Sequence, residues 1–213
     1  MALSKVNFNS LNVTPSASKV LKFNSSNNGL EAGDVGGSLN LISTSTASSS
    51  ATIDITSGID STYKEYIVKF INIHPATDSV HFLFQGDTGT NTNYNQTVTN
   101  VYFQAYNAES DSASLDQLTS LDQGNGTSFI DVAHYVGNEN DESCSGTLHL
   151  FEPSSTDFTK HFMCRINSYN GNDYTSDYFA AGYFNTTTAI TRIRFKMSSG
   201  NIDSGTIKLY GVS

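Results

Sequence analysis

Thr191-Arg-Ile-Arg-Phe-Lys-Met197 is the stretch that decides the fold, because apolar and cationic side chains alternate along it. Gly205-Thr-Ile-Lys-Leu-Tyr210 repeats the alternation. A period of two residues is typical of a strand with one buried and one solvated face. The polar residues between the two stretches favour a turn, so we predict an antiparallel hairpin with one dry face and one basic face. Four cations lie on the basic face: Arg192, Arg194, Lys196 and Lys208.

Strand patterns continue backward from this hairpin as far as residue 38. Residues 51–56 alternate apolar and polar side chains, and residues 63–73 form the longest apolar and aromatic run. Eight to ten strands are expected from residue 38 onward, and no strand–helix–strand alternation is present. The exception is 107–128, where the apolar spacing predicts a short helix or a surface loop. The pattern indicates an all-β fold, an antiparallel β-sandwich of jelly-roll-like order.

The composition agrees with this fold and excludes several classes of protein. Ser, Thr and Asn together make up 74 of the 213 residues, and these short polar side chains compete with helical backbone bonds. The 13 Phe and 11 Tyr provide core volume that a disordered chain lacks. Because the 20 Asp and Glu residues outnumber the 11 Lys and Arg residues, we expect no nucleic-acid partner. No apolar run is long enough for membrane insertion, and the N-terminus lacks the apolar core of a signal peptide.

Residues 1–38 differ from the rest of the chain. Short apolar clusters alternate with Asn and Ser, and a Gly-rich segment follows at 29–37. This pattern predicts an extended N-terminal arm, with residues 39–213 as the sandwich domain. The alternative is a pair of edge strands packed on the main body. In the arm interpretation, five apolar side chains contact the particle or sister subunits: Val6, Phe8, Val20, Leu21 and Phe23.

Residue types that could carry chemistry are present but scattered. The five histidines show no short metal-ligand spacing, so we expect no metal site from them. The loops at 87–93 and 138–142 are dense in oxygen donors without the spacing of an EF-hand, which leaves Ca²⁺ binding open. Cys144 and Cys164 are expected to be free buried thiols rather than a bridge. No catalytic residues and no cofactor are predicted.

The predicted recognition segment is the loop at 169–178, which combines aromatic, amide and carboxylate groups. Such side chains stack on sugars and bind hydroxyl groups, and they also serve protein interfaces. Five residues are candidate receptor contacts: Tyr169, Asn170, Asp173, Tyr174 and Tyr178.

Several segments resemble structural proteins of tailed bacteriophages, especially marine and cyanophage-type ones. The resemblance covers residues 60–213 and is carried by 70–86, 148–162 and 181–190. Its most specific part is the closing Gly205-Thr-Ile-Lys-Leu-Tyr-Gly211, which is similar to the C-terminal sandwich modules of phage fibres and virion decorations.

The resemblance implies a non-enzymatic structural component of the virion, assembled in the host cytoplasm among other virion proteins. It leaves open whether the protein is a fibre, a capsid decoration or a neck or tail protein. Fibre modules are usually trimers, so a homotrimer is expected. The alternative function is a carbohydrate-binding module that recognises a host cell-surface glycan, and a glycan-degrading enzyme ranks last.

Overall fold

The structure, a computed structural model, describes residues 19–26, 28–33 and 39–213. Contacts within the chain divide it into two units, Met1–Ser38 and Leu39–Ser213. The described residues form strands, turns and irregular segments, with no helix among them. The all-β prediction is therefore confirmed.

In the first unit, β1 (Val20–Phe23) and β2 (Leu30–Gly33) form an antiparallel hairpin. Within the described residues they pair with each other and with no strand of the second unit. The predicted contacts Val6 and Phe8 lie outside the described residues.

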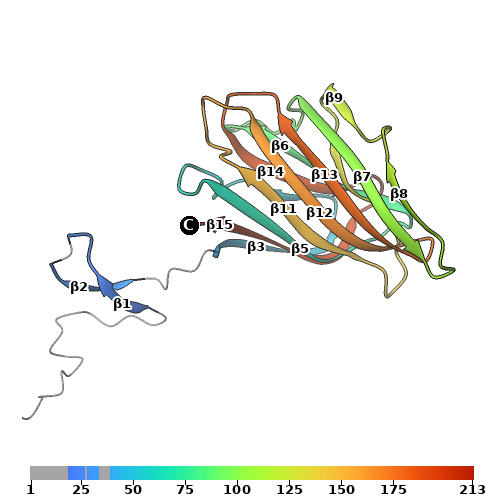
Figure 1. The fold of residues 1–213 in the computed structure, drawn as a ribbon, viewed down its shortest axis with the longest axis horizontal. Helices are drawn as coiled ribbons and strands as arrows, with labels where there is room; N and C mark the ends of the chain where they lie inside the picture. The colour runs from blue at the N-terminus through green and yellow to red at the C-terminus, as the bar shows by residue number, and fades with distance from the viewer. Residues whose placement is uncertain (1–18, 27, 34–38) are drawn as a thin grey trace, which may run out of the picture. The chain divides into compact units, whose positions relative to one another are not determined.

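The second unit, called the body, is one continuous antiparallel sheet of 13 strands (Figure 1). This is more than the eight to ten strands expected. Its strands are β3 (Leu39–Ser50), β4 (Ile53–Ile55), β5 (Glu65–Pro75), β6 (Val80–Thr88), β7 (Val98–Ala108), β8 (Ala113–Gln117), β9 (Gln123–Gly126), β10 (Ile130–Val136), β11 (Cys144–Phe151), β12 (Lys160–Asn170), β13 (Tyr174–Phe184), β14 (Ile190–Met197) and β15 (Ile202–Val212).

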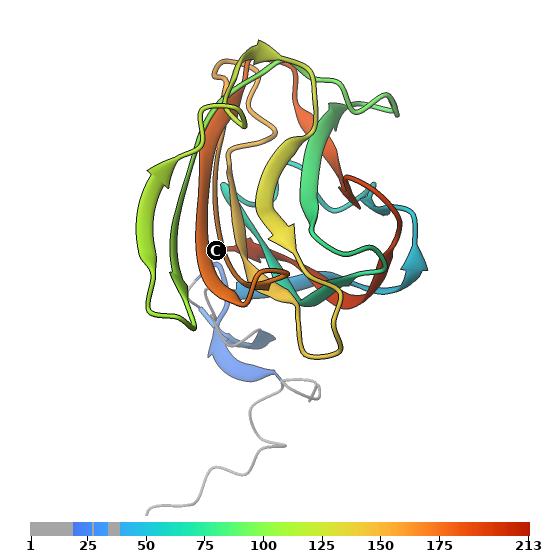
Figure 2. The same cartoon turned by 90° about the vertical axis from the view of Figure 1, so that its right-hand side faces the viewer.

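The sheet folds into two layers that curve toward each other (Figure 2). The large layer has the order β3-β15-β5-β11-β12-β13-β7, with β8 and β9 on the outer edge of β7. The small layer has the order β10-β6-β14-β4, and it joins the large layer where Val136 pairs with Asn170. Many consecutive strands lie in opposite layers, as in a jelly roll, so the sandwich prediction is confirmed.

The core lies between the layers and is rich in phenylalanine. Phe70 on β5 contacts Phe82 and Phe195 of the small layer, with 5.2 Å between ring centroids in both pairs. Phe84 on β6 contacts Phe162 on β12 at 5.1 Å. Strand geometry directs such rings into the core, because alternate side chains of a strand point to the same face. In β12, for example, every second side chain is buried, and Phe162 is one of them.

Two local predictions are wrong. The predicted hairpin does not form, because β14 pairs with β6 and β4 while β15 pairs with β3 and β5. Residues 198–201 cross from one layer to the other instead of turning back along the same sheet. The short helix considered within 107–128 is also absent, and the segment forms β8 and β9 at the edge of β7.

Candidate functional site

The hairpin of β12 and β13 divides the predicted recognition loop between two surfaces. Tyr169 and Asp173 lie at the outer face of the large layer, where the Tyr169 hydroxyl donates to Asp173 Oδ1 at 3.2 Å. Asn170 and Tyr174 pair with each other and point to the opposite face of the large layer, toward the small layer. Tyr178 is fully buried and donates its hydroxyl to the backbone oxygen of His134. Tyr178 therefore cannot contact a receptor, which corrects that part of the prediction.

Three adjoining hollows on the outer face of the large layer form one surface, here called the outer groove. Their volumes are about 370, 430 and 240 Å³. Each hollow shares lining residues with the other two: Asn107 and Thr175 line the first and third, Asn167 the first and second, and Asp177 the second and third. The three hollows are therefore continuous across β11, β12, β13 and β7. The polar lining of the outer groove is Asn107, Glu109, Ser145, Thr147, Arg165, Asn167, Tyr169, Asp173, Thr175 and Asp177.

Arg165 and Asp177 form the charged centre of the outer groove. Arg165 Nη2 donates to Asp177 Oδ2 at 2.6 Å, and its Nε lies 3.1 Å from both carboxylate oxygens. The hydrogen bonds that Arg165 donates to the Asp177 carboxylate raise the pKa of Arg165. The guanidinium also lies 4.8 Å from the ring centroid of Phe179, which stacks on Phe103 at 4.7 Å and 10°. An ion pair thus lies beside a flat aromatic surface.

Neutral polar groups of the outer groove are also held in place. Asn167 Nδ2 donates to Thr175 Oγ1 and to Ser176 O, both at 3.1 Å. The hydrogen bond to Asp173 raises the pKa of Tyr169 to about 12, so this phenol stays a neutral donor at physiological pH. Fixed donors and acceptors beside an aromatic face are suited to a ligand rich in hydroxyl groups.

The other side of the hairpin borders a second hollow of about 230 Å³, here called the seam pocket. Tyr106 and Tyr174 stack within it, with ring centroids 5.1 Å apart and planes at 9°. Asn170 is buried and bonds to the backbone of Asn172 and Tyr174 and to Ser176 Oγ. Its amide group therefore holds the turn together rather than reaching solvent.

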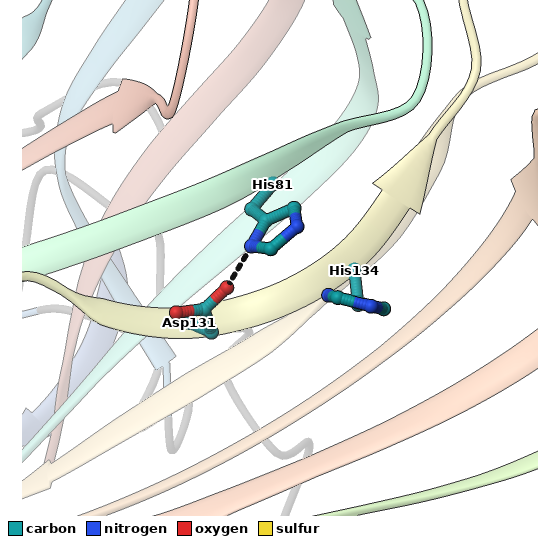
Figure 3. A group of neighbouring side chains, drawn as sticks. All are labelled: His81, Asp131 and His134. Carbon is teal, nitrogen blue, oxygen red and sulfur yellow. Dashed lines mark hydrogen bonds and ion pairs between the residues drawn. The ribbon is translucent and has the colours of Figure 1, made fainter. Parts of the chain in front are cut away.

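A histidine cluster, made of His81, Asp131 and His134, lies next to the seam pocket (Figure 3). His81 Nδ1 lies 2.5 Å from Asp131 Oδ1, and the two imidazole centroids are 4.2 Å apart. Burial, and then the neighbouring His81, lower the pKa of His134 to about 4. His134 is consequently neutral at pH 7, and its buried Nδ1 has no hydrogen-bond partner among the residues that the structure describes.

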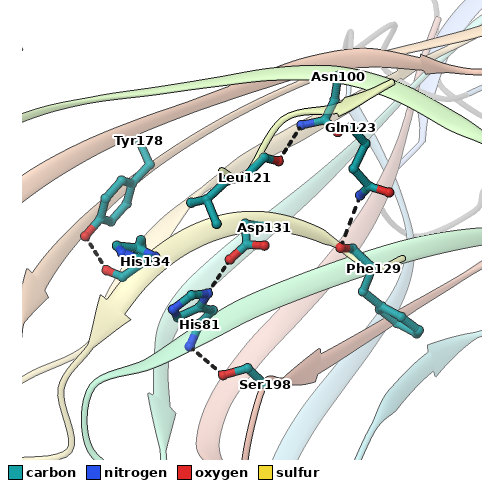
Figure 4. A network of polar contacts seen from close by, with 9 residues as sticks. All are labelled: His81, Asn100, Leu121, Gln123, Phe129, Asp131, His134, Tyr178 and Ser198. Carbon is teal, nitrogen blue, oxygen red and sulfur yellow. Dashed lines mark hydrogen bonds and ion pairs between the residues drawn. The ribbon is translucent and has the colours of Figure 1, made fainter. Parts of the chain in front are cut away.

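Polar contacts surround the histidine cluster (Figure 4). Ser198 Oγ accepts a hydrogen bond from the backbone N–H of His81 at 3.0 Å. Gln123 Nε2 donates to the backbone oxygen of Phe129 at 3.3 Å, just before β10 begins. The first bond ties β6 to the segment after β14, and the second ties β9 to the segment before β10. No local sequence pattern reveals this cluster, because His81 and His134 are 53 positions apart.

The predicted basic face is not a single surface. Arg192, Arg194 and Lys196 lie on β14 in the small layer, whereas Lys208 lies on β15 in the large layer. Arg194 is held by Asp54 through two hydrogen bonds of 2.7 and 2.6 Å. Lys196 Nζ lies over the Phe129 ring at 4.5 Å. Both side chains thus have partners within the body.

The remaining candidates are placed as follows. Val20, Leu21 and Phe23 on β1 are 40%, 42% and 71% exposed. Cys144 and Cys164 are free and buried, as predicted. Asp87, the first residue of the candidate Ca²⁺ loop at 87–93, is buried and accepts hydrogen bonds from Tyr94 N and Gln96 Nε2, so it organises its own loop.

Comparison with known proteins identifies no relative: no family model, no curated protein and no solved structure matches the chain. Within the described residues, no helix has the length and hydropathy needed to cross a membrane.

Proposed function

We propose that the chain is a non-enzymatic structural component of a tailed-phage virion. In this proposal the body is displayed on the particle and segment 1–38 attaches it to other virion proteins or to sister copies in a homotrimer. Assembly takes place in the host cytoplasm. The sequence resemblance motivates the proposal, and the β1–β2 hairpin supports the role of the segment.

The supporting observation is the exposure of apolar side chains on β1. Val20, Leu21 and Phe23 are all exposed on a hairpin whose strands have four residues each. A two-stranded hairpin of this size is marginally stable by itself in water. Covering these side chains with another protein surface would remove apolar area from water and stabilise the hairpin. Segment 1–38 is therefore suited to an interface.

The test replaces Val20, Leu21 and Phe23 together with Ser in the full chain. The matched control is Phe158→Ser, since Phe158 is similarly exposed at 67% but belongs to the body. We expect the triple variant to change from trimer to monomer in light scattering and to be lost from particles in a complementation assay, while the control assembles normally. Normal assembly of the triple variant would contradict the proposed role of the segment.

A second candidate function is glycan binding in the outer groove. The observation that favours it is the fixed Arg165–Asp177 pair, flanked by Asn167, Thr175 and the stacked ring of Phe179. Sugar recognition combines hydrogen bonds to hydroxyl groups with contact between a sugar face and an aromatic ring. A glycan on the host cell surface has this chemistry and would be accessible to a protein displayed on the virion.

A glycan array with the full chain, followed by titration of any ligand found, tests this candidate. Removing one neutral hydrogen bond with Asn167→Ala or Tyr169→Phe should weaken binding by about 3- to 10-fold. The control is Asn172→Ala, because Asn172 lines the seam pocket instead of the outer groove. A loss of binding confined to the control would place the ligand in the seam pocket and refute the outer groove.

A further inference from the structure

We propose that His81, Asp131 and His134 form a binding site for one divalent transition-metal ion of the Zn²⁺ type. The proposed site lies in the body and shares no residue with the outer groove, and the proposal does not depend on the proposed function. Four features of the described residues carry it: the convergence of the ligand atoms, the unpartnered nitrogen of His134, the distorted backbone of β10 and the chemistry of the donor set.

The first feature is convergence. One prospective ligand atom from each of His81, Asp131 and His134 lies within 4.8 Å of the other two. In tetrahedral zinc sites with bonds near 2.0–2.1 Å, the ligand atoms are about 3.4 Å apart. The limit of 4.8 Å exceeds this spacing by about 1.4 Å, a difference that rotation of the two imidazoles can close. Figure 3 shows His81 reaching the cluster from β6, and Asp131 and His134 from β10.

The second feature is the state of His134. Its Nδ1 is buried and has no hydrogen-bond partner within the described chain. A buried polar atom without a partner costs about 1–3 kcal/mol, so native structures usually supply one. A metal ion would accept the Nδ1 lone pair, and Asp131 beside His81 would offset the charge of the ion.

The third feature is the backbone that brings the three residues together. In a regular strand, residues 131 and 134 would point to opposite faces. The pairing of β10 with β6 shifts register between Asp131 and Ala133, and shifts again between Ala133 and Val136. Tyr135, within the second of these shifts, has φ of 52°, which is unusual for a bulky residue. Bulges and strained residues are enriched at functional sites, where they direct particular side chains.

The fourth feature is the donor set. Two imidazole nitrogens and one carboxylate oxygen suit Zn²⁺ and its transition-metal neighbours, whereas Ca²⁺ and Mg²⁺ prefer oxygen ligands throughout. Three protein ligands leave at least one coordination position for water or another donor. The site would link β6 to β10 at the border of the seam pocket.

The test uses the full chain, stripped with EDTA and titrated with ZnCl₂ by calorimetry. We expect one ion per chain, and a loss of affinity of at least about tenfold in His134→Asn and Asp131→Asn. The matched control is His149→Asn. His149 Nδ1 lies 2.6 Å from Glu65 Oε1, which gives a second histidine–carboxylate pair, but this pair belongs to no three-ligand group in the described residues.

A second measurement does not depend on how the variants fold. Co²⁺ added to the stripped wild-type chain should produce the visible absorption bands of a Co²⁺ ion with a low coordination number. One equivalent of Zn²⁺ should abolish these bands. Binding of much less than one ion per chain, absence of these bands, or an equal loss of affinity in His149→Asn would each overturn the proposal.

Discussion

Replacing Phe84 with Ala tests whether the two layers are held together by the phenylalanine cluster. Phe84 on β6 is fully buried, and its ring meets those of Phe162 and Phe184 edge-on at 5.1 and 6.1 Å. Removing the ring loses about 2 kcal/mol of transfer free energy. The two aromatic contacts add about 1–3 kcal/mol. We therefore expect the free energy of unfolding to fall by about 3–5 kcal/mol, the usual range for a buried Phe→Ala change.

Urea unfolding at pH 7, followed by circular dichroism, measures this change. The control is Phe158→Ala, whose ring is 67% exposed and whose removal should alter the unfolding free energy by less than about 0.5 kcal/mol. A domain of ordinary stability, about 5–15 kcal/mol, still folds after the Phe84 change. A loss below about 1.5 kcal/mol with an unchanged denaturant slope would refute the view that Phe84 joins the layers.

Three further predictions concern charges and thiols. Arg194→Ala should lower the unfolding free energy by about 1–2 kcal/mol in the same urea assay, because Asp54 loses its doubly hydrogen-bonded partner. The His134 pKa of about 4 lies below its unfolded value near 6.5, so the unfolded chain binds more protons between these pH values. Stability of the metal-free chain should therefore fall by about 2 kcal/mol from pH 6.5 to 4, allowing for partial exposure of the ring, and His134→Asn should abolish this dependence. Burial raises the pKa of Cys144 to about 12 and that of Cys164 well above its usual value. Neither thiol should react with a disulfide reagent at pH 8 until the chain is unfolded in urea, and rapid native labelling would contradict their burial.

The alternating pattern in β14 and β15 identifies the two strands and their buried faces, but not the strands with which they pair. The two strands were predicted at nearly their observed positions, and the side chains expected to be dry, such as Ile193 and Ile207, are buried. Alternation reports which side of a strand faces the core, and this is equally satisfied by strands in opposite layers. The partners β6 and β5 lie more than 100 residues earlier in the chain, so no local pattern identifies them.

The histidine cluster was unpredictable for a related reason. A strand with regular alternation separates Asp131 from His134, and the two register shifts that reverse this depend on how β10 meets β6. The outer groove was nearer to prediction. A tight turn centred on residue 172 would have paired Asn167 with Asp177, as observed, and placed Arg165 beside this carboxylate.

The same turn explains why the predicted recognition loop serves two surfaces. Odd-numbered positions of β12, including Tyr169, face outward, whereas even-numbered positions continue the buried face that leads to Asn170. Tyr169 and Tyr174 consequently lie on opposite sides of one sheet, so a single compact ligand cannot contact both. Polar and aromatic residues gathered in this loop thus do not form one binding site. They line the outer groove on one side and the seam pocket, beside the histidine cluster, on the other, and substitutions in the two sets should affect different ligands.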